Sequence, residues 1–347
     1  MKSTCSWLMG FLFISLVLGY RDPLLGQQND LQRLYDEAKK EGEVVVGTGV
    51  PPVALKALET AFNKRFPGVK AKVIASTGSK AISRILMESK TGKPTIEVAQ
   101  TTTSTMPPML KRDLVASYDY SAVFGIPQKG ILYGNRLIPW FTLAYVLAYN
   151  PRLVSKDQVP TTWEGLLNPK WKGRKIVLDG RGHPFQYLVH AWGKEKTMGY
   201  VRKLKDQEPI FRPRGGAQII EAVVAGQAPL GTAHVNRVLW AKQKKGTPID
   251  YVWLDYTPLL NFYAYAVKNG AHPNAAKLMA GWLGTPEALK VYEDSSQRGL
   301  IGPESESNTA KAFRKARTEE VWSSVDIDGA KQEKKWQLEA RKILVGQ

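Results

Sequence analysis

The chain has 347 residues, of which 43% are hydrophobic and 23% are charged. This length and balance exclude a largely disordered chain and allow two domains. The formal net charge is +18, a value that often indicates nucleic-acid binding. The basic residues are dispersed, however, and the N-terminus is typical of an exported protein, so we expect no nucleic-acid partner. The charge instead favours attraction to anionic solutes or an anionic membrane surface, with a solvated basic surface as the alternative.

The N-terminus has the pattern of a secretory signal. Lys2 precedes an apolar run at residues 7–18, which the sequence Arg-Asp-Pro at 21–23 ends. A membrane-spanning helix needs about 20 apolar residues, so this run is short for a span. We predict a signal peptide at residues 1–26 and an exported chain, with an uncleaved N-terminal anchor as the alternative. The only cysteine, Cys5, lies in this segment, so no disulfide or cysteine-ligated metal site is expected in the mature chain.

Strand and helix patterns alternate along the chain. A β-branched run at residues 43–47 predicts a buried strand, and the spacing of Leu55, Leu58 and Phe62 predicts a helix that ends before Pro67. Further strands are expected at 69–75, 95–99, 140–149, 175–179, 230–235, 251–254 and 262–267, and further helices at 31–40, around 82–86, and at 184–192, 217–225, 274–283, 286–297 and 331–344. This alternation predicts an α/β fold with mostly parallel strands between layers of helices.

Several stretches together resemble a known family. They include LYDEAKKEGEVVV at residues 34–46, FNKRFPGVKAKV at 62–73, TTWEGLLNPKWKGRKIVLD at 161–179 and HPNAAKLMAGWL at 272–283. In their order and spacing these stretches resemble the periplasmic solute-binding proteins of ABC importers, in the iron(III)-type branch. No single stretch is decisive, but together they extend over nearly the whole mature chain.

The resemblance implies a two-lobed type II periplasmic binding protein fold, in which two crossing strands join the lobes. On that template, residues 43–146 and 262–347 form lobe 1 and residues 147–261 form lobe 2. Each lobe is expected to be a mixed, mostly parallel sheet flanked by helices, and the lobes close around a ligand by a hinge motion. The partners implied are a small-molecule ligand and an ABC permease in the inner membrane, and we expect a monomer.

A ligand is expected beyond the carboxyl ends of the strands, where helix N-termini favour anions. Four strand-to-helix turns meet this description, at residues 76–79, 180–183, 214–218 and 231–237. The predicted ligand-binding residues are Thr48, Thr77, Gly78, Ser79, Thr102, Arg181, Gly182, His183, Gly216, His234 and Tyr263. Simpler interpretations stay open: Ser79 as a helix N-cap, Arg181 in a salt bridge between the lobes, His234 as a structural histidine and Tyr263 as a core residue.

The fourth turn departs from the pattern of the iron binders. Iron-binding members of this branch carry adjacent tyrosines there, whereas this chain has Ala233, His234 and Val235. We therefore predict a small polar or anionic organic ligand, for which Arg181 would supply a paired hydrogen-bonding group. A ferric ion or ferric chelate is the alternative. No protein-bound metal and no cofactor are expected.

An enzyme is the main rival class. The sequence contains no G-x-S-x-G, no H-E-x-x-H and no G-x-x-x-x-G-K motif. We therefore predict no catalytic residues and no enzymatic activity. A binding protein that passes its ligand to a sensory receptor is a second alternative, which the sequence does not separate from transport.

Overall fold

The computed structural model describes residues 23–346, except for residue 77 and residues 303–304. Most of the predicted signal, 1–26, therefore lies outside the described residues. Helix α1 (Pro23–Glu41) begins within the last four residues of that prediction. Among the described residues, no helix is long and apolar enough to cross a membrane.

The first half of the molecule is built on parallel strands. Strand β1 (Glu43–Thr48) lies between β2 (Lys70–Ala75) and β3 (Val98–Thr101), and pairs in parallel with both. Helices α2 (Pro52–Arg65) and α3 (Gly78–Glu88) connect them in the predicted alternation. The short helices α4 (Pro107–Lys111) and α5 (Tyr120–Phe124) and a 3-10 turn at Gln128–Gly130 follow.

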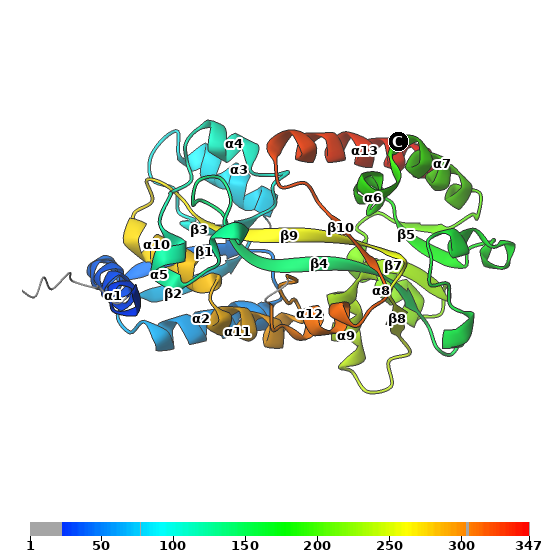
Figure 1. The fold of residues 1–347 in the computed structure, drawn as a ribbon, viewed down its shortest axis with the longest axis horizontal. Coiled ribbons are helices and arrows are strands. Elements are labelled where there is room, and N and C mark those ends of the chain that lie inside the picture. Colours follow the sequence, from blue (N-terminus) through cyan, green and yellow to red (C-terminus); the bar gives the residue numbers. More distant parts are fainter. Residues whose placement is uncertain (1–22, 77, 303–304, 347) are drawn as a thin grey trace, which may run out of the picture.

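Two long strands connect this half to the next. Strand β4 (Ile138–Tyr149) pairs antiparallel with β9 (Tyr256–Ala266). Beyond Ala144 the same β4 pairs with β7 (Leu230–His234), so its two ends belong to different halves. The strand order is β2-β1-β3-β9-β4-β7-β5-β6, with β8 and β10 at its side. Figure 1 shows β4 and β9 running between the two groups of helices. The two-lobed fold with crossing strands is therefore confirmed.

The second half repeats the parallel arrangement. Strand β5 (Ile176–Asp179) lies between β6 (Ile210–Arg212) and β7, while β8 (Asp250–Val252) pairs with the end of β4. The helices of this half are α6 (Phe185–Trp192), α7 (Lys194–Lys205), α8 (Gly216–Val224) and α9 (Val235–Lys242), with 3-10 turns at Lys156–Gln158, Glu164–Leu167 and Pro169–Trp171.

Each half has its own buried core. In the first, Leu58, Phe62 and Trp282 pack in one apolar cluster around the strands. In the second, Trp163 and Leu188 lie in another. Burial of such large apolar side chains is the main stabilising contribution to each half.

The C-terminal segment visits both halves. Helices α10 (Pro273–Leu283) and α11 (Pro286–Ser296) pack on the first half against α1 and α2. The chain then passes through α12 (Asn308–Arg314) and β10 (Glu319–Trp322), which pairs with β9, to α13 (Ile327–Val345). Helix α13 packs against α6 and α7.

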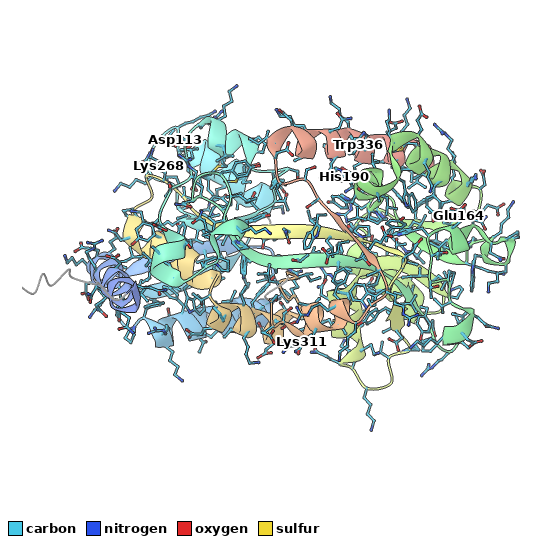
Figure 2. The ribbon with its side chains drawn as sticks, in the orientation of Figure 1. Asp113, Glu164, His190, Lys268, Lys311 and Trp336 are labelled. Atoms are coloured by element: carbon cyan, nitrogen blue, oxygen red, sulfur yellow. The ribbon has the colours of Figure 1, made fainter. Side chains whose placement is uncertain are left out.

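This path bears on the expected lobe boundaries, which stay a prediction. The sequence template assigned all of residues 262–347 to lobe 1, but α13 contributes Ala340 and Leu344 to the core of the second half. The ring of His190 lies edge-on to that of Trp336, with ring centroids 5.5 Å apart. Figure 2 labels both residues where α6 meets α13. The amphipathic pattern predicts the helix but does not indicate which half it covers.

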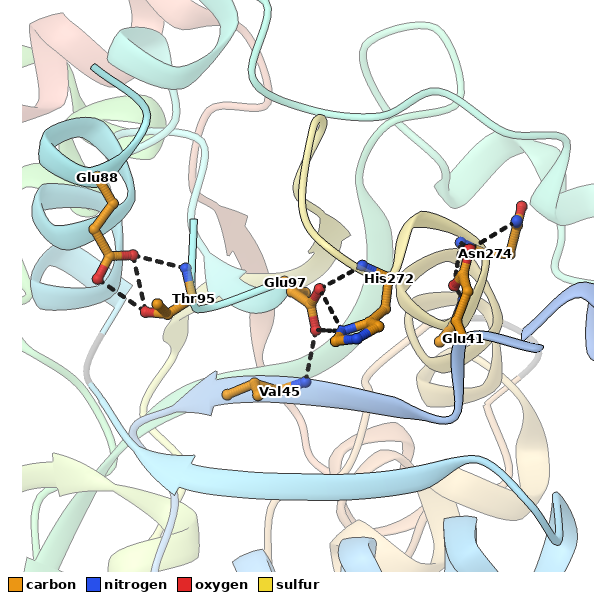
Figure 3. A network of polar contacts seen from close by, with 8 residues as sticks. Glu41, Val45, Glu88, Thr95, Glu97, His272 and Asn274 are labelled. Atoms are coloured by element: carbon orange, nitrogen blue, oxygen red, sulfur yellow. Dashed lines mark hydrogen bonds and ion pairs between the residues drawn. The ribbon is translucent and has the colours of Figure 1, made fainter. Parts of the chain in front are cut away.

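A buried carboxylate ties together three segments of the first half. Glu97, which is 2% exposed, accepts a hydrogen bond from the backbone N–H of Val45 at 3.1 Å and another from the N–H of His272 at 2.7 Å. The His272 ring also lies 3.0 Å from the Glu97 carboxylate, and nearby Glu41 accepts bonds from the first N–H groups of α10 (Figure 3). These carboxylates satisfy donors that would otherwise be buried without partners.

Replacement of Glu97 by Gln should destabilise the protein by about 1–3 kcal/mol, because a neutral amide is a weaker acceptor for the three donors that converge on the buried carboxylate. The free energy of unfolding in urea measures the effect. Glu59→Gln is the control, since Glu59 pairs with Lys56 on the surface at 3.3 Å and should change stability by no more than about 0.5 kcal/mol. Equal effects of the two substitutions would contradict the role assigned to Glu97.

Candidate functional site

Three of the four predicted turns meet in the second half. Gly215 has a φ of +56°, and a Cβ there would lie 2.6 Å from the guanidinium of Arg181. At the next residue, Gly216, a Cβ would have Nε of Arg237 as its nearest neighbour, 3.8 Å away. The turns that follow β5, β6 and β7 are therefore adjacent, as expected for the carboxyl ends of parallel strands.

Arg181 is already paired within its own turn. Its guanidinium forms a two-point interaction with the Asp179 carboxylate, with N–O distances of 2.6 and 2.9 Å. Asp179 is buried, while the side chain of Arg181 is 46% exposed. The Asp179 carboxylate raises the pKa of Arg181. In this structure the guanidinium of Arg181 is engaged by Asp179, and its role in ligand binding stays a prediction.

The same turn is covered by the C-terminal helix. A Cβ at Gly182 would lie 2.5 Å from the backbone oxygen of Gln337, so only glycine fits under α13. The side-chain amide of Gln337 also donates to the backbone oxygen of Arg181 at 2.6 Å. Gly182 is therefore a packing position in this structure. The next residue, His183, has its Nδ1 2.7 Å from the side-chain amide of Gln186, and its ring is stacked on that of Tyr187.

His234 ends β7 and lies beside Tyr145, with ring centroids 4.3 Å apart. Its Nε2 is buried and has no hydrogen-bond partner among the described residues. Burial lowers the pKa of His234, and the charges of Arg237 and Arg298 lower it further. The ring is therefore neutral near pH 7 in surroundings whose net charge is positive.

A pocket of about 290 Å³ is lined in part by Asn236 and Arg237, in the first turn of the helix that follows His234. Its walls come from the loop after β1, from α9 and from the segment after α11, so that the two halves both contribute. The lining residues are Gly49, Val50, Pro51, Pro52, Asn236, Arg237, Trp240, Ser296 and Arg298. A pocket shared between lobes is the usual place for a ligand in such a molecule.

Two arginines in this pocket have no acidic partner among the described residues. Arg298 is 7% exposed; one of its Nη atoms donates to the Tyr292 hydroxyl at 3.0 Å, and its Nε has no partner. Its guanidinium also lies 5.4 Å from the ring centre of Phe141. Arg237 is half-buried, and burial together with the charge of Arg298 lowers its pKa. Two neighbouring positive charges, those of Arg237 and Arg298, thus line a partly buried pocket.

The predicted residues of the first half are mostly engaged elsewhere. Thr48 is buried and donates to the Gln100 side chain at 2.6 Å, and Thr102 lies in a hydroxyl network with Ser104 at 2.9 Å. Tyr263 is 3% exposed in an apolar cluster, and burial raises its pKa to about 12. Tyr263 therefore has the core position that was the alternative interpretation.

The first turn lies at the start of α3. Gly78 is tightly packed, because a Cβ there would lie 2.9 Å from the backbone oxygen of Gln100. Ser79 is exposed on the outer face of the helix. Thr77 lies outside the described residues. Neither Gly78 nor Ser79 lines the shared pocket.

The sequence analysis did not select Arg237, Arg298 or Asn236, which line the shared pocket. Arg237 and Asn236 belong to the fourth turn, but nothing in their spacing singles them out from other polar residues. Arg298 follows α11 and reaches the pocket only because the chain folds back onto the first half. Among the described residues, no group of three or more His, Cys, Asp or Glu side chains is arranged to hold a metal ion.

Comparison with known proteins agrees with the fold. The sequence profile of the bacterial extracellular solute-binding proteins matches residues 45–290. A stretch of 93 residues is 30% identical to the Fe(3+)-binding periplasmic protein of Serratia marcescens, and spans 26% of this chain and 27% of that protein.

Solved structures are similar over most of the chain. Iron-bound HitA from Pseudomonas aeruginosa superposes with a TM-score of 0.71 at 15% identity, over 87% of this chain and 99% of the other. The Trichodesmium protein in complex with iron and citrate gives 0.65 at 20% identity, over 87% and 98%. The substrate-binding protein of an Agrobacterium tumefaciens ABC transporter gives 0.69 at 16%, over 86% and 95%. At sequence identities this low, the similarity to these structures shows a shared fold.

The buried histidines should make stability depend on pH. Burial lowers the pKa of His183 to about 4, against an opposing effect of Asp179, whereas an unfolded histidine titrates near about 6.5. Between these values the unfolded chain binds more protons, so stability is full above about pH 6.5 and falls as the pH drops towards 4. His183→Gln should flatten the decrease in melting temperature between pH 7 and 5. An unchanged slope would contradict this origin.

Proposed function

Because the chain belongs to the bacterial extracellular solute-binding proteins, we propose that it captures a small anionic solute between its two halves in the periplasm and delivers it to an ABC importer. The coarser part of this function, solute binding in a transport system, follows from the family and its binding-protein fold. The anionic character of the solute is the finer part, and it rests on the shared pocket.

The observation that carries the proposal is that the shared pocket is lined by two positively charged side chains and by no negatively charged one. Arg237 and Arg298 both line it, and no described carboxylate forms an ion pair with either. A buried charge without a partner is costly, so such an arrangement favours a bound group of opposite sign. The same charges disfavour an unaccompanied ferric ion, because like charges repel strongly where water is excluded.

A ferric chelate with net negative charge is the second candidate. Its support comes from the relatives, whose names refer to iron, including the Fe(3+)-binding protein of Serratia marcescens and the Trichodesmium protein with iron and citrate. These names favour iron more than they favour a purely organic solute. The missing tyrosine pair at residues 233–235 and the cationic pocket favour a chelate over the bare ion.

A thermal-shift panel on the mature protein should separate the candidates. We expect citrate, inorganic phosphate or an alkyl phosphonate to raise the melting temperature, because a ligand that binds only the folded state at 100 times its Kd adds about 2.7 kcal/mol of stability. A ferric citrate response without a citrate response would favour the chelate. A response to Fe(III) alone, with none to any anion, would contradict the proposal.

Arg181→Ala should leave the affinity for a stabilising anion within about threefold, because its charge is already paired with the Asp179 carboxylate and the net gain for a ligand is small. Isothermal titration of the two proteins measures this. A loss of more than tenfold would show that the guanidinium leaves Asp179 to bind the ligand, as the sequence-based prediction supposed.

A further inference from the structure

We propose that Arg237 and Arg298 form a two-sided clamp for one acidic group of the solute, a carboxylate, phosphate or phosphonate, and that the clamp is complete only when the two halves are together. This inference rests on the proposed function and specifies where in the pocket the negative charge is held. It replaces the Arg181 turn as the expected anion site.

The two arginines come from opposite sides of the pocket. Arg237 lies in the first turn of α9, which belongs to the second half, whereas Arg298 follows α11 on the first half. Opening of the two halves about β4 and β9 would therefore separate them. An anion between them would offset their mutual repulsion and favour the closed arrangement, which is the differential interaction that a hinge motion requires.

Arg298 is held in place before any ligand arrives. Its bond to the Tyr292 hydroxyl and its position over Phe141 fix the guanidinium, and its backbone N–H donates to the Ser296 hydroxyl at 3.3 Å. The bond to Tyr292 uses one Nη atom of Arg298, and the contact with Phe141 uses one face of its guanidinium. The Nε atom of Arg298 is left without a partner, although the residue is only 7% exposed. Fixed donors of this kind lose little entropy when they bind an oxyanion.

Two further features of the pocket suit an oxyanion. The loop at Gly49–Pro52 brings the N-terminus of α2 to the pocket wall, and no side chain caps this helix. Its positive end therefore adds to the field of the arginines. Asn236 is 4% exposed and its side-chain oxygen has no partner in the described part of the chain, so a protonated oxygen of the bound acid could donate to it.

Isothermal titration of the full mature chain with inorganic phosphate and with citrate tests the clamp. Arg237→Gln and Arg298→Gln should each weaken the binding of whichever anion binds the wild type by about 10- to 100-fold, because each removes a charge-assisted hydrogen bond. Arg65→Gln is the control, because Arg65 is an exposed arginine that pairs with Glu287 at 3.5 Å and does not line the pocket, and it should have little effect.

A second readout separates a binding role from a structural one. Arg237 has no internal partner in the described structure, so Arg237→Gln should leave the melting temperature of the ligand-free protein unchanged or raise it while affinity falls. If Arg298→Gln does not fold, Arg237→Gln carries the test alone. If the wild type binds an anion and Arg237→Gln binds it with an affinity within twofold, the clamp is overturned but the proposed function is not. If neither ferric citrate nor any of the anions bound to the wild type, the clamp and the proposed function would both be overturned.

Discussion

The pairing of β4 with β9 is the constraint on which the rest of the structure depends. Both strands are long enough to leave one half and enter the other, and their antiparallel register fixes how far each extends. Because Ile138 to Ala144 pair with β9 while Tyr145 to Tyr149 pair with β7, one continuous strand sets the position of both sheets. The shared pocket lies between the two halves that these strands connect.

The same constraint brings together the residues that line the shared pocket. The turns after β5, β6 and β7 meet at one edge, and the loop after β1 faces them from the other half. Charge is distributed unevenly over this region. Asp179 neutralises Arg181, while Arg237 and Arg298 lack such a partner among the described residues. The location of the carboxylate therefore decides which arginine is already neutralised within the protein, and a count of arginines near the pocket does not.

Much of the fold could be predicted from the sequence, because the strands β1, β2 and β5 are short apolar runs with a clear period. The sequence predicts a strand only from residue 262, because Pro258 and Asn261 are residues that strands disfavour and so mask the first part of β9. In the structure Pro258 pairs with Val321 of the parallel strand β10. Of the candidate site, the turn that contains His234 was located, but the partners of Thr48 and Arg181 were not. Those partners, Gln100 and Asp179, become visible only when neighbouring strands and turns are placed in space.

The return of the C-terminal helix also has a consequence for the order of folding. Helix α13 is distant in sequence from the segments on which it packs, yet its residues Ala340 and Leu344 complete the core that Trp163 and Leu188 begin. Until α13 docks, the middle of the sequence exposes that apolar surface and the turn at Gly182 lacks its cover. The second half therefore reaches its final packing only when α13 has packed against α6 and α7.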